Sequence, residues 1–116
     1  MTRLIESGLV LQLEFHISGF IADACHHESK TLIEFFGDIY HCNPARFKDS
    51  TSFCPWINRT VDEQRIRDKR RFACFAEHGY KTLVIWEADW RANPLQEIAN
   101  IHGKINERIS INFKDN

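Results

Sequence analysis

The stretch Thr31-Leu-Ile-Glu-Phe-Phe-Gly-Asp-Ile-Tyr-His41 does most to decide the fold of this chain. Its first half is an apolar run, which favours a buried strand. Glu34, Asp38 and His41 lie close together toward the end of that run. A strand that ends in carboxylates and an imidazole is typical of a metal-dependent active site.

A second apolar run lies just upstream, Gly19-Phe-Ile-Ala-Asp-Ala-Cys25, and residues 26–30 form a plausible turn between the two. If both runs are adjacent antiparallel strands, Asp23 and Glu34 meet at one point. Mg²⁺ is usually held by one or two carboxylates together with substrate phosphates and water. Two such carboxylates, with a histidine nearby for proton transfer, suit hydrolysis of a phosphodiester. The alternative is that both are ordinary solvent-facing strand residues.

Residues 58–78 have the pattern of a long amphipathic helix. Thr60 can cap it, because Glu63 follows three residues later as in a capping box. Gly79 is its stop signal. The expected buried positions on this helix are Ile66, Phe72, Phe75 and Ala76.

The rest of the chain predicts one more strand and one more helix. Residues 80–86 form a β-branched and aromatic run, which reads as a buried strand. Pro94 fits the first turn of a helix that ends near residue 109. The expected order is strand, strand, helix, strand, helix, an α/β (α+β) arrangement. A length of 116 residues with 43% hydrophobic content supports one domain with one core.

Four segments carry a family resemblance: residues 23–25, 31–44, 67–71 and 79–87. They resemble the very short patch repair endonucleases and their phage-borne homing endonuclease relatives, within the PD-(D/E)XK nuclease superfamily. The most specific feature is Glu-Phe-x-Gly-Asp-x-x-His followed later by Gly-Tyr-x-x-x-x-Ile-Trp-Glu. The resemblance implies a restriction-endonuclease-like core, with a mixed β-sheet flanked by helices, in a single nuclease domain over residues 1–116.

The homing relatives are described by an active-site set of Glu, Asp, a variable position, His and Asp. By this resemblance Asp23 is the first Asp, His41 the histidine and Asp68 the final Asp. The variable position falls at Glu34 or Phe35, and Glu34 is favoured because only it can bind a metal with Asp23. His41 would then activate water or protonate the leaving group, with Asp68 holding its ring in one tautomer.

The amino terminus departs from the family. The leading Glu of the family comes from a helix well upstream of the first Asp, and Glu6 and Glu14 are the only candidates ahead of Asp23. Residues 2–11 could form only a shortened helix. The site is therefore either supported by Glu6 or lacks that carboxylate. Asp38 is expected to support the metal ligands without binding the metal itself.

The cysteines bear on a zinc site. In the repair enzymes a structural zinc is bound near this strand, but Asp38 and Ala88 occupy two of the ligand places, so no such zinc is expected. Cys25, Cys42, Cys54 and Cys74 form no Cys-x-x-Cys pair, and small free thiols are often simply buried. The alternative is a zinc site that lacks the usual ligand spacing. Its ligands would be His41, Cys42, Cys54 and one of His26 or His27.

Net charge is only −1, so any attraction to nucleic acid must come from local clusters. One cluster stands out, formed by Arg65, Arg67, Lys69, Arg70 and Arg71. It would contact backbone phosphates, or it is a solvated helix face. Trp56, in a loop over residues 49–57, would stack on a base or wedge into a base step. Its ring would equally plug the core.

The first functional hypothesis is a Mg²⁺-dependent endonuclease that nicks or cleaves double-stranded DNA, with Mn²⁺ able to substitute. A role in homing or in mismatch repair is implied by the resemblance. The first alternative is a DNA-binding module that has lost catalysis. The second is a structural or assembly protein that reuses the fold.

Location and partners complete the expectations. No secretory signal and no apolar run of about 20 residues is visible, which predicts a soluble protein of the bacterial or phage-infected cytoplasm, away from membranes. No Gly-rich phosphate loop suggests a nucleotide cofactor. A shortened first helix would leave an apolar sheet face uncovered, and this favours a homodimer.

Overall fold

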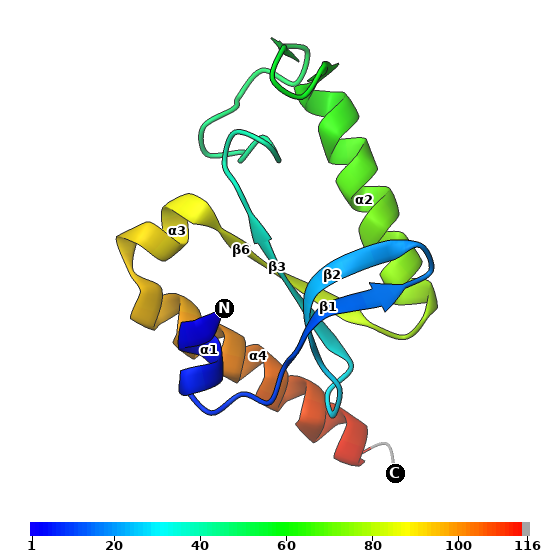
Figure 1. The fold of residues 1–116 in the computed structure, drawn as a ribbon, viewed down its shortest axis with the longest axis vertical. Coiled ribbons are helices and arrows are strands. Elements are labelled where there is room, and N and C mark those ends of the chain that lie inside the picture. The colour runs from blue at the N-terminus through cyan, green and yellow to red at the C-terminus, as the bar shows by residue number, and fades with distance from the viewer. Residues whose placement is uncertain (115–116) are drawn as a thin grey trace.

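The computed structural model describes residues 1–114 and shows an α+β fold built on a four-stranded mixed sheet (Figure 1). The strand order in this sheet is β1-β2-β3-β6, and β4 and β5 form a separate two-stranded sheet. In chain order the elements are α1 (Thr2–Glu6), β1 (Gln12–Ile17), β2 (Phe20–His26), β3 (Thr31–Phe36), β4 (Phe53–Cys54), β5 (Arg59–Thr60), α2 (Val61–Glu77), β6 (Lys81–Trp86), α3 (Glu87–Ala92) and α4 (Pro94–Lys114).

The pairing of β2 with β3 sets the geometry of the site. The two strands are antiparallel, as predicted, and Ala24 lies opposite Ile33. One step further in this register, Asp23 lies opposite Glu34. β3 is parallel to β6, so the chain crosses from one to the other through α2. The carboxyl ends of β3 and β6 therefore lie at the same edge of the sheet.

Both faces of the sheet are covered. Successive strand residues point to opposite faces, so Ile33 and Leu32 belong to different cores. The Ile33 core joins α1 and α4 to the sheet through Leu4, Leu9, Ala24, Ile85, Ile101 and Ile105. On the other face Phe75 of α2 packs with Leu32, and Figure 1 shows α2 and α4 on different sides of β3 and β6. The expectation of an uncovered apolar face was therefore wrong, and the homodimer stays a prediction without that support.

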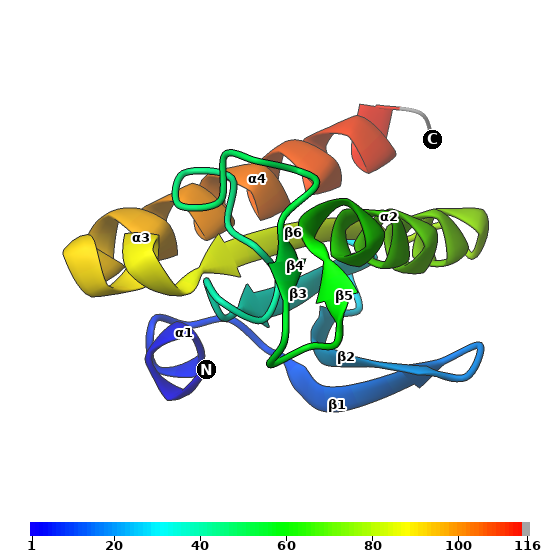
Figure 2. The ribbon, with the colours of Figure 1, turned by 90° about the horizontal axis from the view of Figure 1, so that it is seen from above.

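The start of α2 is fixed by its capping box. Thr60 Oγ1 accepts a hydrogen bond from Glu63 N at 3.1 Å, and Glu63 Oε1 accepts one from Thr60 N at 3.1 Å. The helix begins at Val61 rather than near residue 58, because Arg59–Thr60 pair with Phe53–Cys54 as β5 and β4. Seen from above, these short strands lie beside the start of α2 (Figure 2).

Two of the four buried positions predicted on α2 were wrong. Phe75 is fully buried and Phe72 half-buried, but Ile66 is 42% exposed and Ala76 is exposed. The first half of α2 packs through Val61 against a loop cluster that contains Cys42 and Cys54. Its inward side is set by that loop rather than by the sheet, which leaves Ile66 outside.

Four elements were not predicted: β1, β4, β5 and α3. β1 is an edge strand, and its pairing with β2 joins Leu13 to Ala24 and Phe15 to Ala22 without a pair at Glu14. Glu14 has φ 51°, a left-handed conformation that interrupts the strand pattern. β3 ends at Phe36, so Asp38 and His41 lie in the turn that follows it. Over residues 1–114, no helix combines the length and apolar character that crossing a bilayer requires.

Candidate active site

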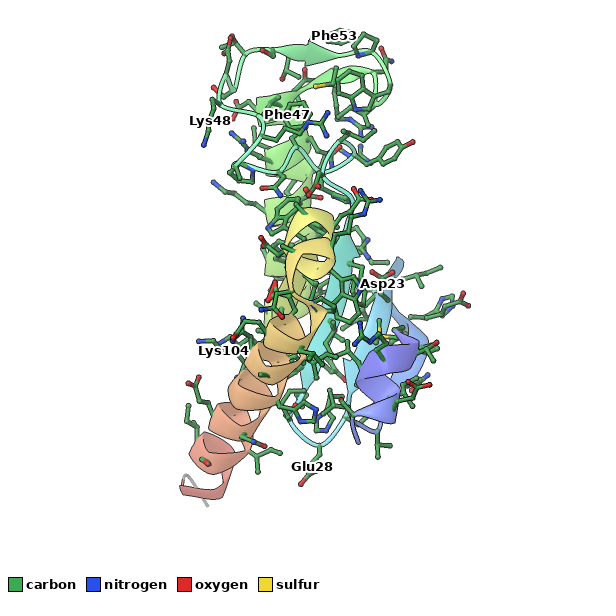
Figure 3. The ribbon with its side chains drawn as sticks, turned by 90° about the vertical axis from the view of Figure 1, so that its left-hand side faces the viewer. Asp23, Glu28, Phe47, Lys48, Phe53 and Lys104 are labelled. Carbon is green, nitrogen blue, oxygen red and sulfur yellow. The ribbon has the colours of Figure 1, made fainter. Side chains whose placement is uncertain are left out.

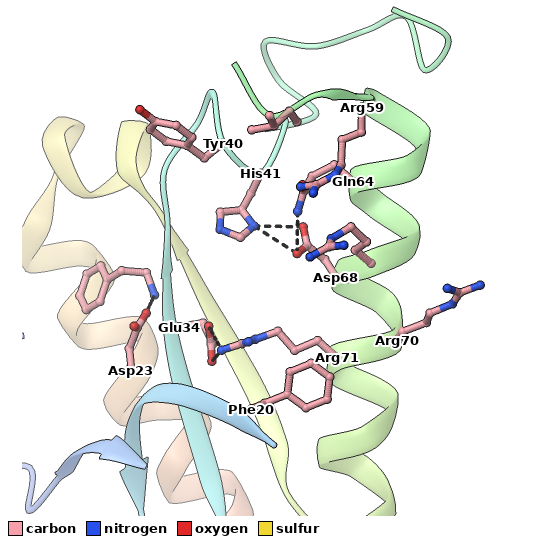
Figure 4. A pocket seen from close by; sticks show the side chains of 13 residues that line it. Phe20, Asp23, Glu34, Tyr40, His41, Arg59, Gln64, Asp68, Arg70 and Arg71 are labelled. Carbon is pink, nitrogen blue, oxygen red and sulfur yellow. Dashed lines mark hydrogen bonds and ion pairs between the residues drawn. The ribbon is translucent and has the colours of Figure 1, made fainter. Parts of the chain in front are cut away.

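One cavity of about 650 Å³ lies between α2, the end of β3 and the loop that follows it (Figure 4). Four predicted site residues line it: Asp23, Glu34, His41 and Asp68. They come from two strands, a loop and a helix, so only the folded chain brings them together. Four arginines also line the cavity, Arg59, Arg67, Arg70 and Arg71.

Asp23 is placed by the end of the β2–β3 ladder. The last printed pair of that ladder is Ala24 with Ile33, so the next backbone N–H groups of β3 need other acceptors. Asp23 Oδ2 accepts a hydrogen bond from Phe35 N at 2.7 Å. The carboxylate is otherwise exposed. It is thus fixed in direction while it remains open to solvent and to a ligand.

Glu34 is the buried carboxylate of the site, with only 3% of the residue exposed. Arg71 Nη2 donates to both of its oxygens, at 2.9 Å to Oε1 and 3.2 Å to Oε2. Burial raises the pKa of Glu34, the Arg71 guanidinium opposes that rise, and the nearby charge of Asp23 adds to it. Arg71 was predicted to face outward with the basic cluster, but it is half-buried against Glu34.

His41 is oriented on two sides. Its Nδ1 lies 3.1 Å and 3.2 Å from the two oxygens of Asp68, and the Phe36 ring stacks on the imidazole at 3.7 Å between centroids. Gln64 Nε2 donates to Asp68 Oδ1 at 3.1 Å, and Arg59 Nη1 donates to Gln64 Oε1 at 2.7 Å. A carboxylate beside Nδ1 favours the tautomer with its proton there. Nε2 is then free to act as a base.

Asp38 supports the loop rather than the cavity. Its buried Oδ1 accepts hydrogen bonds from Asn43 Nδ2 at 2.8 Å and from Ala88 N at 3.3 Å. Asp38 N donates to Glu87 Oε1 at 3.3 Å. These contacts tie the turn that carries His41 to the start of α3. Asp38 does not line the cavity, and its support of the metal ligands stays a prediction.

The structure does not bring Glu6 to the site. Glu6 is exposed on α1 and does not line the cavity. Glu14 lies closer, since it lines an adjoining cavity of about 570 Å³ together with Asp23 and Phe35. Leu13 and Phe15 pair with Ala24 and Ala22, on either side of Asp23, so Glu14 lies across from Asp23 without pairing with it. Of the two acidic candidates at the amino terminus, Glu14 is therefore the one near Asp23.

The predicted basic cluster divides into three parts. Arg67, Arg70 and Arg71 line the cavity, and Lys69 is exposed outside it. Arg65 turns to the loop and donates to the carbonyl oxygens of Cys42 at 3.4 Å and Phe47 at 2.8 Å. The helical repeat turns the side chains in different directions, so the five residues do not form one surface.

Trp56 does not plug the core, and its contact with a base stays a prediction. Its ring is half exposed, and Nε1 donates to the Ile39 carbonyl oxygen at 2.7 Å. Tyr40, 57% exposed, lines the cavity beside His41 and was not predicted as a site residue. Its position next to His41 in sequence was the only available signal. Figure 3 shows Phe47 and Phe53 at the same loop end of the molecule, away from Glu28.

The side chains of the alternative zinc site are not arranged to bind a metal ion together. Cys42 and Cys54 are buried together with Val61. Burial, and after it the neighbouring Cys54 thiol, raise the pKa of Cys42 to about 11. Zinc binds the thiolate form, which this environment disfavours. Among the side chains that the structure describes, no three His, Cys, Asp or Glu groups are arranged to hold a metal ion.

The carboxylates do suit a hard cation in kind and number. Mg²⁺ needs one or two carboxylates and takes its other ligands from phosphates and water. Asp23 and Glu34 line the same cavity, and Asp23 is exposed. The one departure is the Arg71 guanidinium, which covers both oxygens of Glu34.

No protein-family model matches this sequence, and no curated protein matches it. The likeness to the repair and homing endonucleases therefore remains a resemblance carried by motifs. The function is inferred from the cavity and its side chains.

Proposed function

We propose that this protein is a metal-dependent DNA endonuclease that hydrolyses phosphodiester bonds, on a restriction-endonuclease-like core. One observation carries the proposal: the His41–Asp68 pair and the carboxylates of Asp23 and Glu34 line a single cavity. A proton-transfer group and ligands for a hard cation are the two parts that this reaction needs.

The roles follow from the positions of the atoms. Bound at Asp23 and Glu34, Mg²⁺ would polarise the phosphate and make a bound water more acidic. His41 Nε2 takes a proton from the attacking water or gives one to the leaving oxygen. Asp68 keeps the proton on Nδ1 and stabilises the charged imidazolium. Phe36 holds the plane of the ring.

The arginines supply affinity for the nucleic-acid backbone. Arg67 and Arg70 are exposed residues that line the cavity and would contact phosphates of double-stranded DNA. Tyr40 is an exposed residue that lines the same cavity, and it offers a ring for a nucleotide base. The net charge of −1 makes this local surface, rather than the whole chain, responsible for binding.

The test is conversion of supercoiled plasmid to nicked or linear DNA with Mg²⁺ or Mn²⁺. The native chain is compared with Asp23→Ala and His41→Ala, and Glu107→Ala on α4 is the control for loss of an exposed carboxylate. Cleavage by the native chain and the control, and by neither site variant, is expected. A native chain that leaves the plasmid intact with both metals would refute the hydrolase.

A second candidate is a DNA-binding module without cleavage. The contact of Arg71 with both oxygens of Glu34 favours it, because that contact occupies the buried carboxylate. This candidate predicts that the native chain retards DNA in a gel while plasmid stays supercoiled with either metal. Retardation by Arg67→Ala should then be weaker than by the native chain.

A further inference from the structure

Arg71 extends from α2, the helix proposed to face DNA, to the buried carboxylate of Glu34. Its Nη2 donates to both oxygens of Glu34, and the same nitrogen donates to the Ile21 carbonyl oxygen. The Glu34 side chain is 4% exposed and that of Arg71 22% exposed. Both residues line the cavity, so the pair can be reached from it (Figure 4).

The guanidinium is well placed but poorly satisfied. It lies over the rings of Phe20 and Phe75, at 5.5 Å and 5.2 Å from their centroids. Its Nε is buried and has no hydrogen-bond partner among the described residues. Arginine carries five N–H donors in a planar fork. Arg71 makes its contacts with Glu34 and Ile21 through Nη2, so Nη1 has no hydrogen bond among the described residues and can donate to another acceptor.

A divalent cation and Arg71 compete for Glu34. A metal ion bound through these oxygens would lie directly beside the guanidinium, and the two positive charges would repel each other at short range. One carboxylate can neutralise one of them well. In the free protein the guanidinium is already in place, held by Glu34, Ile21 and the two phenylalanine rings.

A phosphate in the cavity changes this balance. Arg67 and Arg70 lie on the same helix and line the same cavity, so a DNA backbone that binds them comes within reach of Arg71. A phosphate accepts two parallel hydrogen bonds from a guanidinium, which suits the unused donors of Arg71. Transfer of Arg71 to the phosphate would free both oxygens of Glu34.

We propose that Arg71 is a latch on the metal site, which occupies Glu34 in the free protein and moves to a backbone phosphate when DNA binds. This rests on the proposed function for the identity of the metal ligands. Metal binding and DNA binding then strengthen each other, by the same factor in each direction. The free protein holds divalent metal weakly, and the complete site assembles only on the substrate.

The experiment measures Mn²⁺ binding by the electron paramagnetic resonance signal of the free ion. Arg71→Met removes the competing charge, and Lys104→Met is the control, an exposed cation on α4 that does not line the cavity. Without DNA, we expect Arg71→Met to bind Mn²⁺ about tenfold more tightly than the native chain, and Lys104→Met to bind like the native chain. Equal or weaker binding by Arg71→Met overturns the latch.

The second arm adds a short duplex, in a His41→Ala background so that the DNA stays intact, with the Mn²⁺ bound by duplex alone subtracted. The duplex supplies phosphate ligands to the metal in both chains, so the difference between them is the test: the duplex should strengthen Mn²⁺ binding by an about tenfold larger factor when Arg71 is present than in Arg71→Met. Arg71→Lys should fall between the two, and it replaces Arg71→Met if circular dichroism shows that variant unfolded. Binding is followed from about pH 7 to pH 8.5, because an unpaired buried carboxyl also competes for protons.

The two proposals fail separately. If the native chain cleaves plasmid while Arg71→Met and the native chain bind Mn²⁺ equally, the latch is wrong and the nuclease stands. If Arg71→Met binds Mn²⁺ more tightly but the native chain does not cleave DNA, the latch stands and the nuclease is wrong.

Discussion

At the scale of single residues, the charge of Asp68 is the sharpest test of the His41 pair. Asp68→Asn keeps the shape of the side chain, but an amide can donate to Nδ1 and so favours the tautomer with the proton on Nε2. We expect nicking under single-turnover conditions to slow by about a hundredfold or more. Asp62→Asn, an exposed residue in the first turn of the same helix, should cleave at the native rate.

His26 predicts a dependence of stability on pH. Burial lowers its pKa below the ordinary value of 6.5, Glu28 opposes this shift, and His27 and His102 add to it. The folded state therefore disfavours protonation of His26. The stability that depends on neutral His26 is fully present above pH 6.5 and declines as pH falls below that value. Urea unfolding at a series of pH values should show a shallower decline for His26→Gln, and no such change for exposed His16→Gln.

At the scale of elements, the capping box of α2 carries a measurable share of stability. Thr60→Ala removes the acceptor for Glu63 N, and loss of such a cap typically costs about 1 kcal/mol. The urea midpoint should fall while the slope of the transition stays the same. Thr60→Ser keeps the oxygen and should retain most of the stability. An unchanged midpoint in Thr60→Ala would show that the loop, not the cap, fixes the start of α2.

The elements that could be predicted were those with a strong local signal. The antiparallel β2–β3 pair, the capping box and β6 followed from apolar runs and cap residues, and the structure confirmed them. β1 was missed although Leu13, Phe15 and Ile17 alternate with polar residues, which is the pattern of a half-buried strand. The exposed Ile66 was mispredicted because a loop, distant in sequence, takes the place of the sheet against the first half of α2.

The contacts in the site divide in the same way, into those that follow from local sequence and those that depend on the packing of distant elements. The approach of Asp23 to Glu34 follows from strand register, which is a local property of a hairpin. The contact of Arg71 with Glu34 joins residues 37 positions apart, and it depends on the rotation of α2 about its axis. A run of basic residues in sequence cannot show which member turns inward.

At the scale of the whole molecule, binding to DNA should be strongly salt-dependent even though the net charge is −1. The logarithm of the binding constant falls with the logarithm of salt concentration by about 0.9 for each phosphate contact. Arg67→Ala should therefore reduce this slope by about one. Lys104→Ala, which removes an exposed lysine on α4, should leave the slope unchanged. Fluorescence anisotropy of a labelled duplex, without divalent metal, measures both. Equal slopes for the native chain and Arg67→Ala would remove Arg67 from the interface.

The edge of the sheet has a consequence for the behaviour of the protein at high concentration. β1 has a partner strand on one side only, so a row of its backbone groups faces outward. The left-handed Glu14 breaks that row between Leu13 and Phe15 and places an exposed carboxylate in the gap. An intruding strand from another molecule finds no continuous template there, and it meets a negative charge. The left-handed conformation of Glu14 thereby protects the protein against aggregation through the β1 edge of its sheet.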